Sequence, residues 1–179
     1  MTIDEIIGFV SGLDGVLALT PAPGDDWPEL SWGDAFFYYS PDGVVPANVQ
    51  PFATVVTKNY PDDEASRLDR ADTFRVNIHA GKDEFTRRLG RTPREAAETD
   101  VDPGVADTVI AHPVYGTAGW LAVVNPASRT EAVTRELLGT AYQRARARYE
   151  RRARDQGRNS TSSIRSNSPA RRPPSGASG

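Results

Sequence analysis

The two histidines of this 179-residue chain, His79 and His112, are its first candidates for chemistry, since histidine exchanges protons near neutral pH. Either could pair with a carboxylate for acid–base work or join carboxylates in a mononuclear metal site. The available acidic partners are Asp34, Asp62, Asp63 and Glu64. The histidines lie 33 positions apart and no HExxH spacing occurs, so we assign no catalytic and no metal-binding residue. A small hydrolase or metal-assisted enzyme using His79 or His112 stays as an alternative.

Other catalytic classes lack their signatures in this chain. It contains no cysteine, which excludes a cysteine nucleophile, a thiolate zinc site, an iron–sulfur cluster and a disulfide scaffold. There is no G-x-S-x-G elbow, no GxGxxG and no Walker A loop. We therefore expect a non-enzymatic protein without a cofactor.

Aromatic residues recur near the polar candidates, as in many small-ligand sites. Trp27, Trp32, Phe36, Tyr38, Tyr115 and Trp120 could line an apolar pocket with Asn77, His79 and His112 as polar contacts. An ordinary core with a polar rim is the alternative reading. If a ligand binds, we expect the residues that contact it to be Tyr38, Asn77, His79, His112 and Trp120.

Charge is distributed unevenly along the chain. Residues 1–140 carry 11 basic and 22 acidic side chains, whereas residues 141–179 carry 10 basic and 2 acidic ones. The basic segment suggests nucleic-acid binding, because arginine neutralises phosphates. The residues for that alternative are Arg144, Arg148, Arg151 and Arg152. The net charge of −11 on residues 1–140 argues against it.

Residues 155–179 are rich in Ser, Arg, Pro and Gly, with Ile164 as the one large aliphatic residue. Such a segment buries too little apolar surface to offset the cost of ordering, so we predict a disordered tail. It could be a solvated tail, an arm that binds polyanions, a partner for the acidic body or the product of drift at the gene's end. The folded domain is predicted to span residues 1–154.

Periodicity predicts the elements that would position these candidates. The capping box Thr2 to Glu5 and the apolar spacing that follows predict a helix over residues 2–13. Strands are predicted at 16–20, 31–39, 52–57, 74–78 and 120–124. The 31–39 strand is aromatic on both faces, so it is either covered on both sides or lines a groove with one face. The alternation in 74–78 indicates a half-buried strand.

Three further helical segments and a loop complete the expected pattern. Residues 60–73 read as a polar surface loop, 81–89 as a short helix, and Thr92-Pro93 as a second helix start. A long helix over 130–154 ends the domain. Together these elements predict an α+β fold, a single domain with a mainly antiparallel sheet on which an N-terminal helix and a long C-terminal helix pack.

Location and source follow from composition. No apolar run approaches the roughly 20 residues of a membrane-spanning helix, and Asp4 and Glu5 stand where a secretory signal would carry positive charge. We expect a cytoplasmic protein with no membrane partner. Arginine outnumbers lysine 19 to 2, which favours GC-rich codons and a bacterial source.

Four blocks of the sequence carry a family resemblance. WGDAFFYYSPDG, PFATVVTKNYPDDEASRLDR, FRVNIHAG and AHPVYGTAGWLAVVNP resemble the actinobacterial family called domain of unknown function 6194, over roughly residues 1–152. More loosely, Val76-Asn77, Trp120 and Ala141-Tyr142 are similar in order to the MmcQ/YjbR-like superfamily. That similarity implies an α+β fold and a DNA-binding label based on a double-wing surface. The acidic body and the 60–73 loop depart from it.

These observations favour a small cytoplasmic binding or interaction protein with a free C-terminal tail. Its partner would be a small molecule or a protein. Nucleic-acid binding through the basic segment is the second reading, and the histidine-dependent enzyme is the third.

Overall fold

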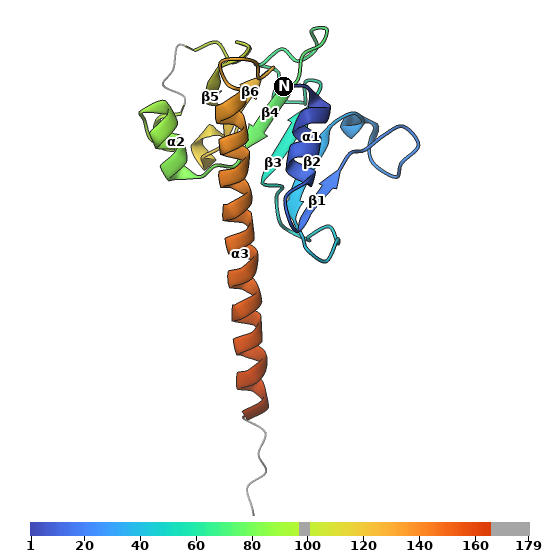
Figure 1. The fold of residues 1–179 in the computed structure, drawn as a ribbon, viewed down its shortest axis with the longest axis vertical. Coiled ribbons are helices and arrows are strands. Elements are labelled where there is room, and N and C mark those ends of the chain that lie inside the picture. Colours follow the sequence, from blue (N-terminus) through green and yellow to red (C-terminus); the bar gives the residue numbers. More distant parts are fainter. Residues whose placement is uncertain (97–100, 166–179) are drawn as a thin grey trace, which may run out of the picture. The chain divides into compact units, whose positions relative to one another are not determined.

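The computed structural model describes residues 1–96 and 101–165, with side chains described as far as residue 156 and at residue 158. The chain divides into two units, residues 1–146 and residues 147–179, and each is described by itself. The first unit holds an antiparallel sheet of six strands in the order β1-β2-β3-β4-β6-β5 (Figure 1). The α+β prediction is confirmed.

The helices of the described chain are α1 (Ile3–Ser11), α2 (Lys82–Leu89) and α3 (Glu131–Arg165), with short 3-10 turns η1 (Glu29–Ser31), η2 (Pro93–Glu95) and η3 (Gly116–Ala118). The strands are β1 (Val16–Leu19), β2 (Ala35–Tyr39), β3 (Ala53–Val56), β4 (Arg75–Ile78), β5 (Val109–Ala111) and β6 (Leu121–Val124). Strand β5 was not predicted, and the strand expected from residue 31 begins at Ala35, because Glu29–Ser31 forms a 3-10 turn.

The N-terminal helix begins as its sequence predicts. The Thr2 side chain accepts a hydrogen bond from the Glu5 amide, and the Glu5 carboxylate accepts one from the Thr2 amide. This reciprocal pair satisfies two amide groups that the first turn leaves without partners inside the helix. Ile6 and Val10 then point into the core. The same capping box forms at Thr92 and Glu95, but only the short turn η2 follows it.

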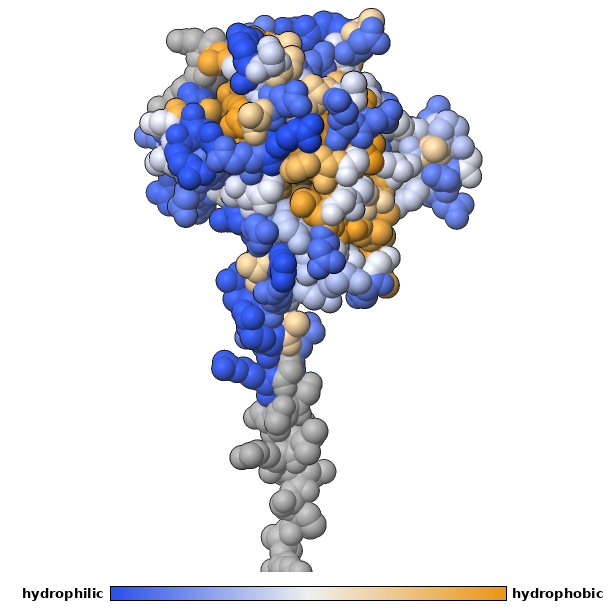
Figure 2. Space-filling view, in the orientation of Figure 1, coloured by the Kyte–Doolittle hydropathy of each residue, from blue (hydrophilic) through white to orange (hydrophobic). Residues whose placement is uncertain are grey.

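One face of the sheet is buried under helices. Figure 1 shows α1 and the part of α3 in the first unit on the same side of the strands. The core residues on this side include Val10, Phe37, Val76, Leu121 and Leu137, all fully buried. We call this side the helix-covered face. Figure 2 views the molecule from this side and shows apolar residues gathered on the surface over α1.

The opposite side of the sheet carries the alternate residues of the same strands. Antiparallel pairing places Thr54 of β3 beside Asn77 of β4, and Asn77 beside Ala122 of β6. Directly paired residues point to the same side of a sheet. Segment 57–74, which links β3 to β4, covers this side: its Leu68 packs against Val56 and Val124. We call this side the loop-covered face.

Strand β4 corrects one sequence prediction. Its alternation of polar and apolar residues indicated a half-buried strand, yet all four residues are buried. Arg75 is 1% exposed and Asn77 is 5% exposed. The loop over this face supplies polar partners to Arg75, and Asn77 bonds to Arg75 and to Thr54 of β3, so a pattern that is usual for a solvated face belongs here to a buried one.

The chain leading into α3 is tied to an earlier segment. The Asp107 carboxylate accepts hydrogen bonds from the backbone amides of Ala127, Arg129 and Thr130 and from the Thr130 hydroxyl. Partial burial raises the pKa of Asp107, but these hydrogen bonds outweigh it and hold that pKa well below its usual range. The carboxylate therefore stabilises the first turn of α3 while it is ionised.

The second unit begins at Ala147, and its described residues continue α3 to Arg165. The sequence predicted an end near Arg154, so the helix is described eleven residues further. Figure 2 shows a mostly hydrophilic surface on residues 147–156 of this helix. The predicted disorder of 155–179 stays a prediction, and residues 166–179 lie outside the described residues.

Candidate functional site

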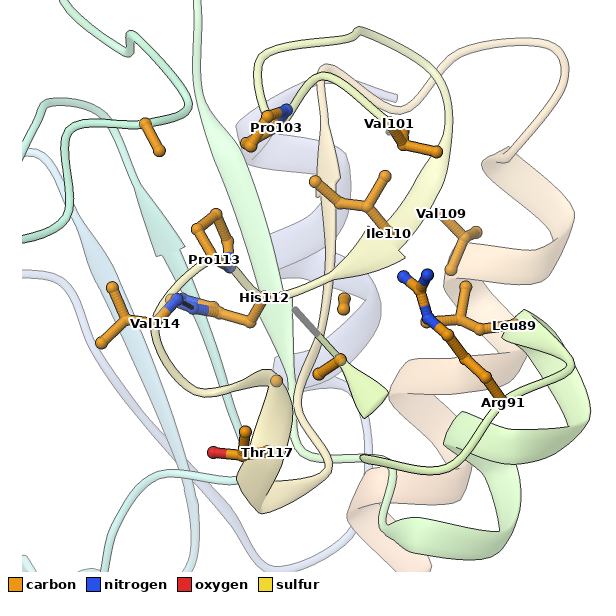
Figure 3. Close-up of a pocket in the computed structure, with 14 residues that line it drawn as sticks. Leu89, Arg91, Val101, Pro103, Val109, Ile110, His112, Pro113, Val114 and Thr117 are labelled. Atoms are coloured by element: carbon orange, nitrogen blue, oxygen red, sulfur yellow. Dashed lines mark hydrogen bonds between the residues drawn. The ribbon is translucent and has the colours of Figure 1, made fainter. Parts of the chain in front are cut away.

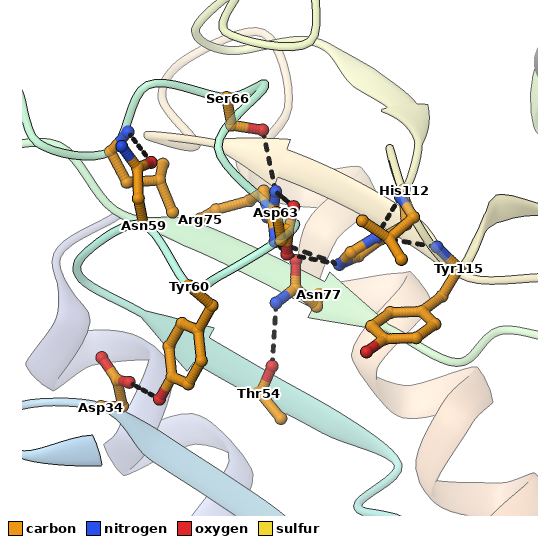
Figure 4. A network of polar contacts seen from close by, with 12 residues as sticks. Asp34, Thr54, Asn59, Tyr60, Asp63, Ser66, Arg75, Asn77, His112 and Tyr115 are labelled. Atoms are coloured by element: carbon orange, nitrogen blue, oxygen red, sulfur yellow. Dashed lines mark hydrogen bonds and ion pairs between the residues drawn. The ribbon is translucent and has the colours of Figure 1, made fainter. Parts of the chain in front are cut away.

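A buried polar network lies on the loop-covered face, with Arg75 at its centre (Figure 4). The Arg75 guanidinium donates to both carboxylate oxygens of Asp63 and to the Ser66 hydroxyl, 2.9 Å away. Its Nε donates to Asn77 Oδ1 at 2.7 Å, and Asn77 Nδ2 donates to Thr54 Oγ1 at 3.0 Å. The network thus joins two strands to the covering loop.

His112 completes the network from the segment between β5 and β6. Its Nε2 lies 3.1 Å from the terminal nitrogen NH2 of Arg75, and its Nδ1 accepts hydrogen bonds from the backbone amides of Val114 and Tyr115. Burial, and then the charge of Arg75, lower the pKa of His112 to about 3. The imidazole is therefore neutral at physiological pH. These contacts hold the ring in place beside Arg75.

A second set of hydrogen bonds anchors the covering loop at its start. The side chain of Asp34, which has no exposed area, accepts from the Thr57 amide, the Thr57 hydroxyl, the Lys58 ammonium and the Tyr60 phenol. Burial, and then the hydrogen bond to Asp34, raise the pKa of Tyr60 above its ordinary value. Tyr60 therefore stays protonated and keeps donating to Asp34.

A cavity of about 430 Å³ opens above this network. Its polar residues include Thr54, Asn77 and His112, and its walls come from strand β2, from the covering loop and from the segment before β6. We call it the loop-face cavity. The lining residues are Phe36, Gln50, Pro51, Thr54, Val56, Tyr60, Pro61, Asp62, Asp63, Asn77, His112, Val114, Tyr115 and Trp120.

Three of the five predicted ligand residues line this cavity, namely Asn77, His112 and Trp120. Tyr38 lies on β2, opposite Leu17 of the edge strand β1, and is not among the lining residues. His79 stacks on the Trp120 ring, with ring centroids 5.0 Å apart and 5° between the planes, and it does not line the cavity either. Their roles in ligand binding stay predictions.

The wider aromatic group proposed from the sequence divides in the same way. Phe36 and Tyr115 line the cavity, so one aromatic residue of β2 faces a groove while Tyr38, on the same face, does not line it. Trp27 and Trp32 are not among its lining residues; Trp27 is an exposed residue. Sequence reasoning missed Arg75, Thr54 and Tyr60. Their one signal was polar character inside or beside predicted strands.

A second cavity, of about 390 Å³, lies on the other side of His112 (Figure 3). Its walls are mainly apolar and come from strand β5 and from the ends of α2 and η2, with Leu89 and Ile110 among them. His112 and Val114 line both cavities. The walls of this second cavity adjoin residues 97–100, which lie outside the described residues.

The four arginines proposed for nucleic acid fall in different units. Arg144 belongs to the first unit, and its guanidinium lies so close to the Gly81 backbone that a Cβ at that position would collide with it. Arg148, Arg151 and Arg152 belong to the second unit, where Arg151 and Arg152 are exposed. Arg144 therefore also has a packing role at the start of α2.

Two other kinds of site are absent from the described residues. No helix among residues 1–96 and 101–165 is long and apolar enough to cross a membrane. In the same part of the chain, no group of three or more His, Cys, Asp or Glu side chains is placed to hold a metal ion.

Comparison with known proteins gives a family. No curated protein and no solved structure matches the chain significantly. A family model described as "Family of unknown function (DUF6194)" matches residues 1–154, which include every residue of the loop-face cavity. The chain therefore belongs to the DUF6194 family.

Proposed function

We propose that this chain is a small-molecule-binding protein and that the loop-face cavity is its site. The observation that carries the proposal is the cavity itself. Its volume of about 430 Å³ lies within the range of roughly 300–1,000 Å³ usual for ligand pockets. Apolar and aromatic walls over a few polar groups are the combination that gives such pockets both affinity and orientation.

Hydrogen bonds hold the polar side chains under the cavity in fixed positions. Arg75 holds Asp63, Ser66 and Asn77 in place, and Asp34 fixes the loop through Tyr60. A site whose side chains are already ordered loses less entropy when a ligand binds. This preorganisation supports a binding role for the cavity.

The geometry of His112 gives the enzyme alternative little support. Backbone amides donate to Nδ1, and the Arg75 guanidinium faces Nε2. A general base needs a nitrogen lone pair within hydrogen-bond reach of the substrate. The two amides occupy the lone pair of Nδ1, and the neutral ring then carries its hydrogen on Nε2, so His112 serves better as a fixed wall than as a proton acceptor. His79 lies against Trp120 instead.

The test is to block the cavity in the full chain. Gln50 is an exposed lining residue, so Gln50→Trp places an indole at the mouth without disturbing the core. Val44→Trp is the matched control: Val44 is 64% exposed, lies in the same β2–β3 connection and does not line the cavity.

Melting temperatures are measured with a panel of metabolites. We expect some compounds to raise the melting temperature of the unmodified chain and of Val44→Trp, but not that of Gln50→Trp. The proposal fails if no compound stabilises the unmodified chain, or if Gln50→Trp responds as the control does.

A second candidate, nucleic-acid binding by the second unit, has its own observation. At 100° per residue, five arginines of α3 after Ala147 fall within roughly half of the helix circumference. They are Arg148, Arg151, Arg152, Arg154 and Arg158. A one-sided row of guanidinium groups suits a phosphate backbone. The DNA-binding label of the MmcQ/YjbR-like superfamily points the same way, and similarity to that superfamily stays a prediction.

Charge removal in the full chain tests this candidate. Arg→Gln changes at 151, 152 and 154 should weaken binding to a labelled duplex and reduce the salt slope by about 0.9 for each phosphate that is no longer neutralised. Arg→Gln changes at the exposed Arg67, Arg94 and Arg129 remove the same charge from the first unit. Equal weakening in both variants, or no binding near physiological salt, would exclude this role for α3.

A further inference from the structure

The loop-face cavity has an unusual balance of charge. Its lining includes the acidic residues Asp62 and Asp63 but no lysine or arginine. Arg75 lies beneath the lining and is fully buried in its pairing with Asp63. The charges of Arg75 and Asp63 cancel, and His112 is neutral. The negative charge of Asp62 is therefore not balanced by any of these groups. The cavity therefore has a negative bias.

Aromatic rings add to that bias. Phe36, Tyr60, Tyr115 and Trp120 contribute four rings to the lining. Figure 4 shows Tyr60 and Tyr115 on opposite sides of Thr54 and Asn77. The face of an aromatic ring carries negative quadrupole density and attracts a cation within about 6 Å of its centroid. Rings on several sides suit a compact, weakly hydrated positive group.

The remaining polar atoms of the floor can orient such a ligand. Thr54 accepts from Asn77, which leaves the Thr54 hydroxyl hydrogen for another acceptor. Asn77 uses one of its two amide hydrogens in that bond. The floor thus offers donors to a neutral oxygen of the ligand, while the rings and Asp62 face its charge.

We infer that the loop-face cavity takes an organic cation, an amine or quaternary ammonium compound that also carries a hydroxyl or carbonyl oxygen. This inference rests on the proposed function, since it names the ligand class of the same cavity. The net charge of −11 over residues 1–140 favours the approach of a cation to the first unit.

Choline and its uncharged isostere 3,3-dimethyl-1-butanol provide the first test, because they match in shape and differ in charge. Each is titrated into the full chain at constant ionic strength, and binding is followed by the NMR resonances of Trp120 and Tyr115. We expect choline to bind about five- to thirtyfold more tightly, the range that cation–π contacts supply between exposed and desolvated sites.

Three substitutions test which residues produce the preference for choline over its isostere. Asp62→Asn and Tyr115→Leu should each weaken choline binding about two- to fivefold and leave the isostere unchanged. Both residues are exposed, so neither change threatens the fold. Asp72→Asn is the control for Asp62: both are exposed aspartates of positive φ in the same connection, and Asp72 does not line the cavity.

The outcomes separate this inference from the proposed function. Equal or tighter binding of the uncharged isostere would overturn the cation preference and leave the cavity as a binding site. A panel in which uncharged compounds bind and no organic cation does would do the same. If neither probe nor any panel compound binds, both the inference and the proposed function fall.

Discussion

The two faces of strand β4 are buried by different means. Val76 and Ile78 point toward the helices and lose water to apolar side chains. Arg75 and Asn77 point to the other side and are surrounded by hydrogen-bond partners, which the covering loop provides for Arg75 and strand β3 provides for Asn77. The first kind of burial is tolerant of approximate fit, whereas the second requires every partner to be in place. The ligand site that we propose is on the second face.

The largest expected effect is at the centre of the loop-covered face. Arg75→Met leaves the Asp63 carboxylate without its cation, and breaking a buried pair from one side costs about 3–5 kcal/mol of unfolding free energy. Urea denaturation measures this decrease. In the double variant Arg75→Met, Asp63→Asn, part of the stability should return.

The exposed pair Arg67 and Asp102 is the control, since both side chains are solvated and Arg67→Met should lower the unfolding free energy much less than Arg75→Met does. If Arg75→Met costs no more than Arg67→Met, the loop-covered face does not depend on its ion pair, and the contrast between the faces disappears.

Acid should lower the free energy of unfolding through His112, which belongs to the loop-covered face. His112 has a pKa of about 3 in the folded chain, against about 6.5 for an unperturbed histidine. Between these values the unfolded chain binds a proton that the folded chain excludes, so the unfolding free energy falls as the pH falls. The slope is at most about 1.4 kcal/mol per pH unit.

His112→Asn removes this titration and keeps a side-chain acceptor for the amides of Val114 and Tyr115. Urea unfolding between about pH 7.5 and pH 5 should show a shallower pH dependence in His112→Asn than in the unmodified chain. Identical slopes in the two proteins would mean that the fold does not hold His112 neutral.

The smallest effect concerns the anchor of the loop. Tyr60→Phe removes one of the four donors to the buried Asp34, for an expected cost of about 1–2 kcal/mol. Tyr38→Phe, a half-buried tyrosine on the same face, should cost less than about 0.5 kcal/mol. A cost in Tyr60→Phe as small as that in Tyr38→Phe would show that the loop is held without this bond.

Local patterns were sufficient to predict the helix-covered face. The capping box at Thr2, the helical spacing of Ile6 and Val10, and the aromatic strand that contains Phe37 are all short-range signals, and the structure confirms each. Strand β5 has only three residues, Val109–Ala111, which is too short for periodicity to distinguish.

The candidate site was predicted only in part, for the same physical reason. Asn77, His112 and Trp120 could be selected by residue type, and they do line the cavity. Arg75 could not, because an arginine in an alternating strand usually faces water. Its burial depends on Asp63, which lies twelve positions earlier in an irregular loop. Hydrophobic periodicity does not predict a partner in such a loop.

The hydrogen bonds of Asp107 bear on the order of folding. Asp107 lies 23 positions before Thr130, so the segment that becomes α3 does not contain the carboxylate that stabilises its first turn. That interaction forms only after the intervening chain, with β5 and β6, has closed into a loop. An interaction that forms late acts on the rate of unfolding more than on the rate of folding. We therefore expect Asp107→Ala to speed unfolding of the chain more than it slows folding, a difference that stopped-flow unfolding and refolding rates would measure.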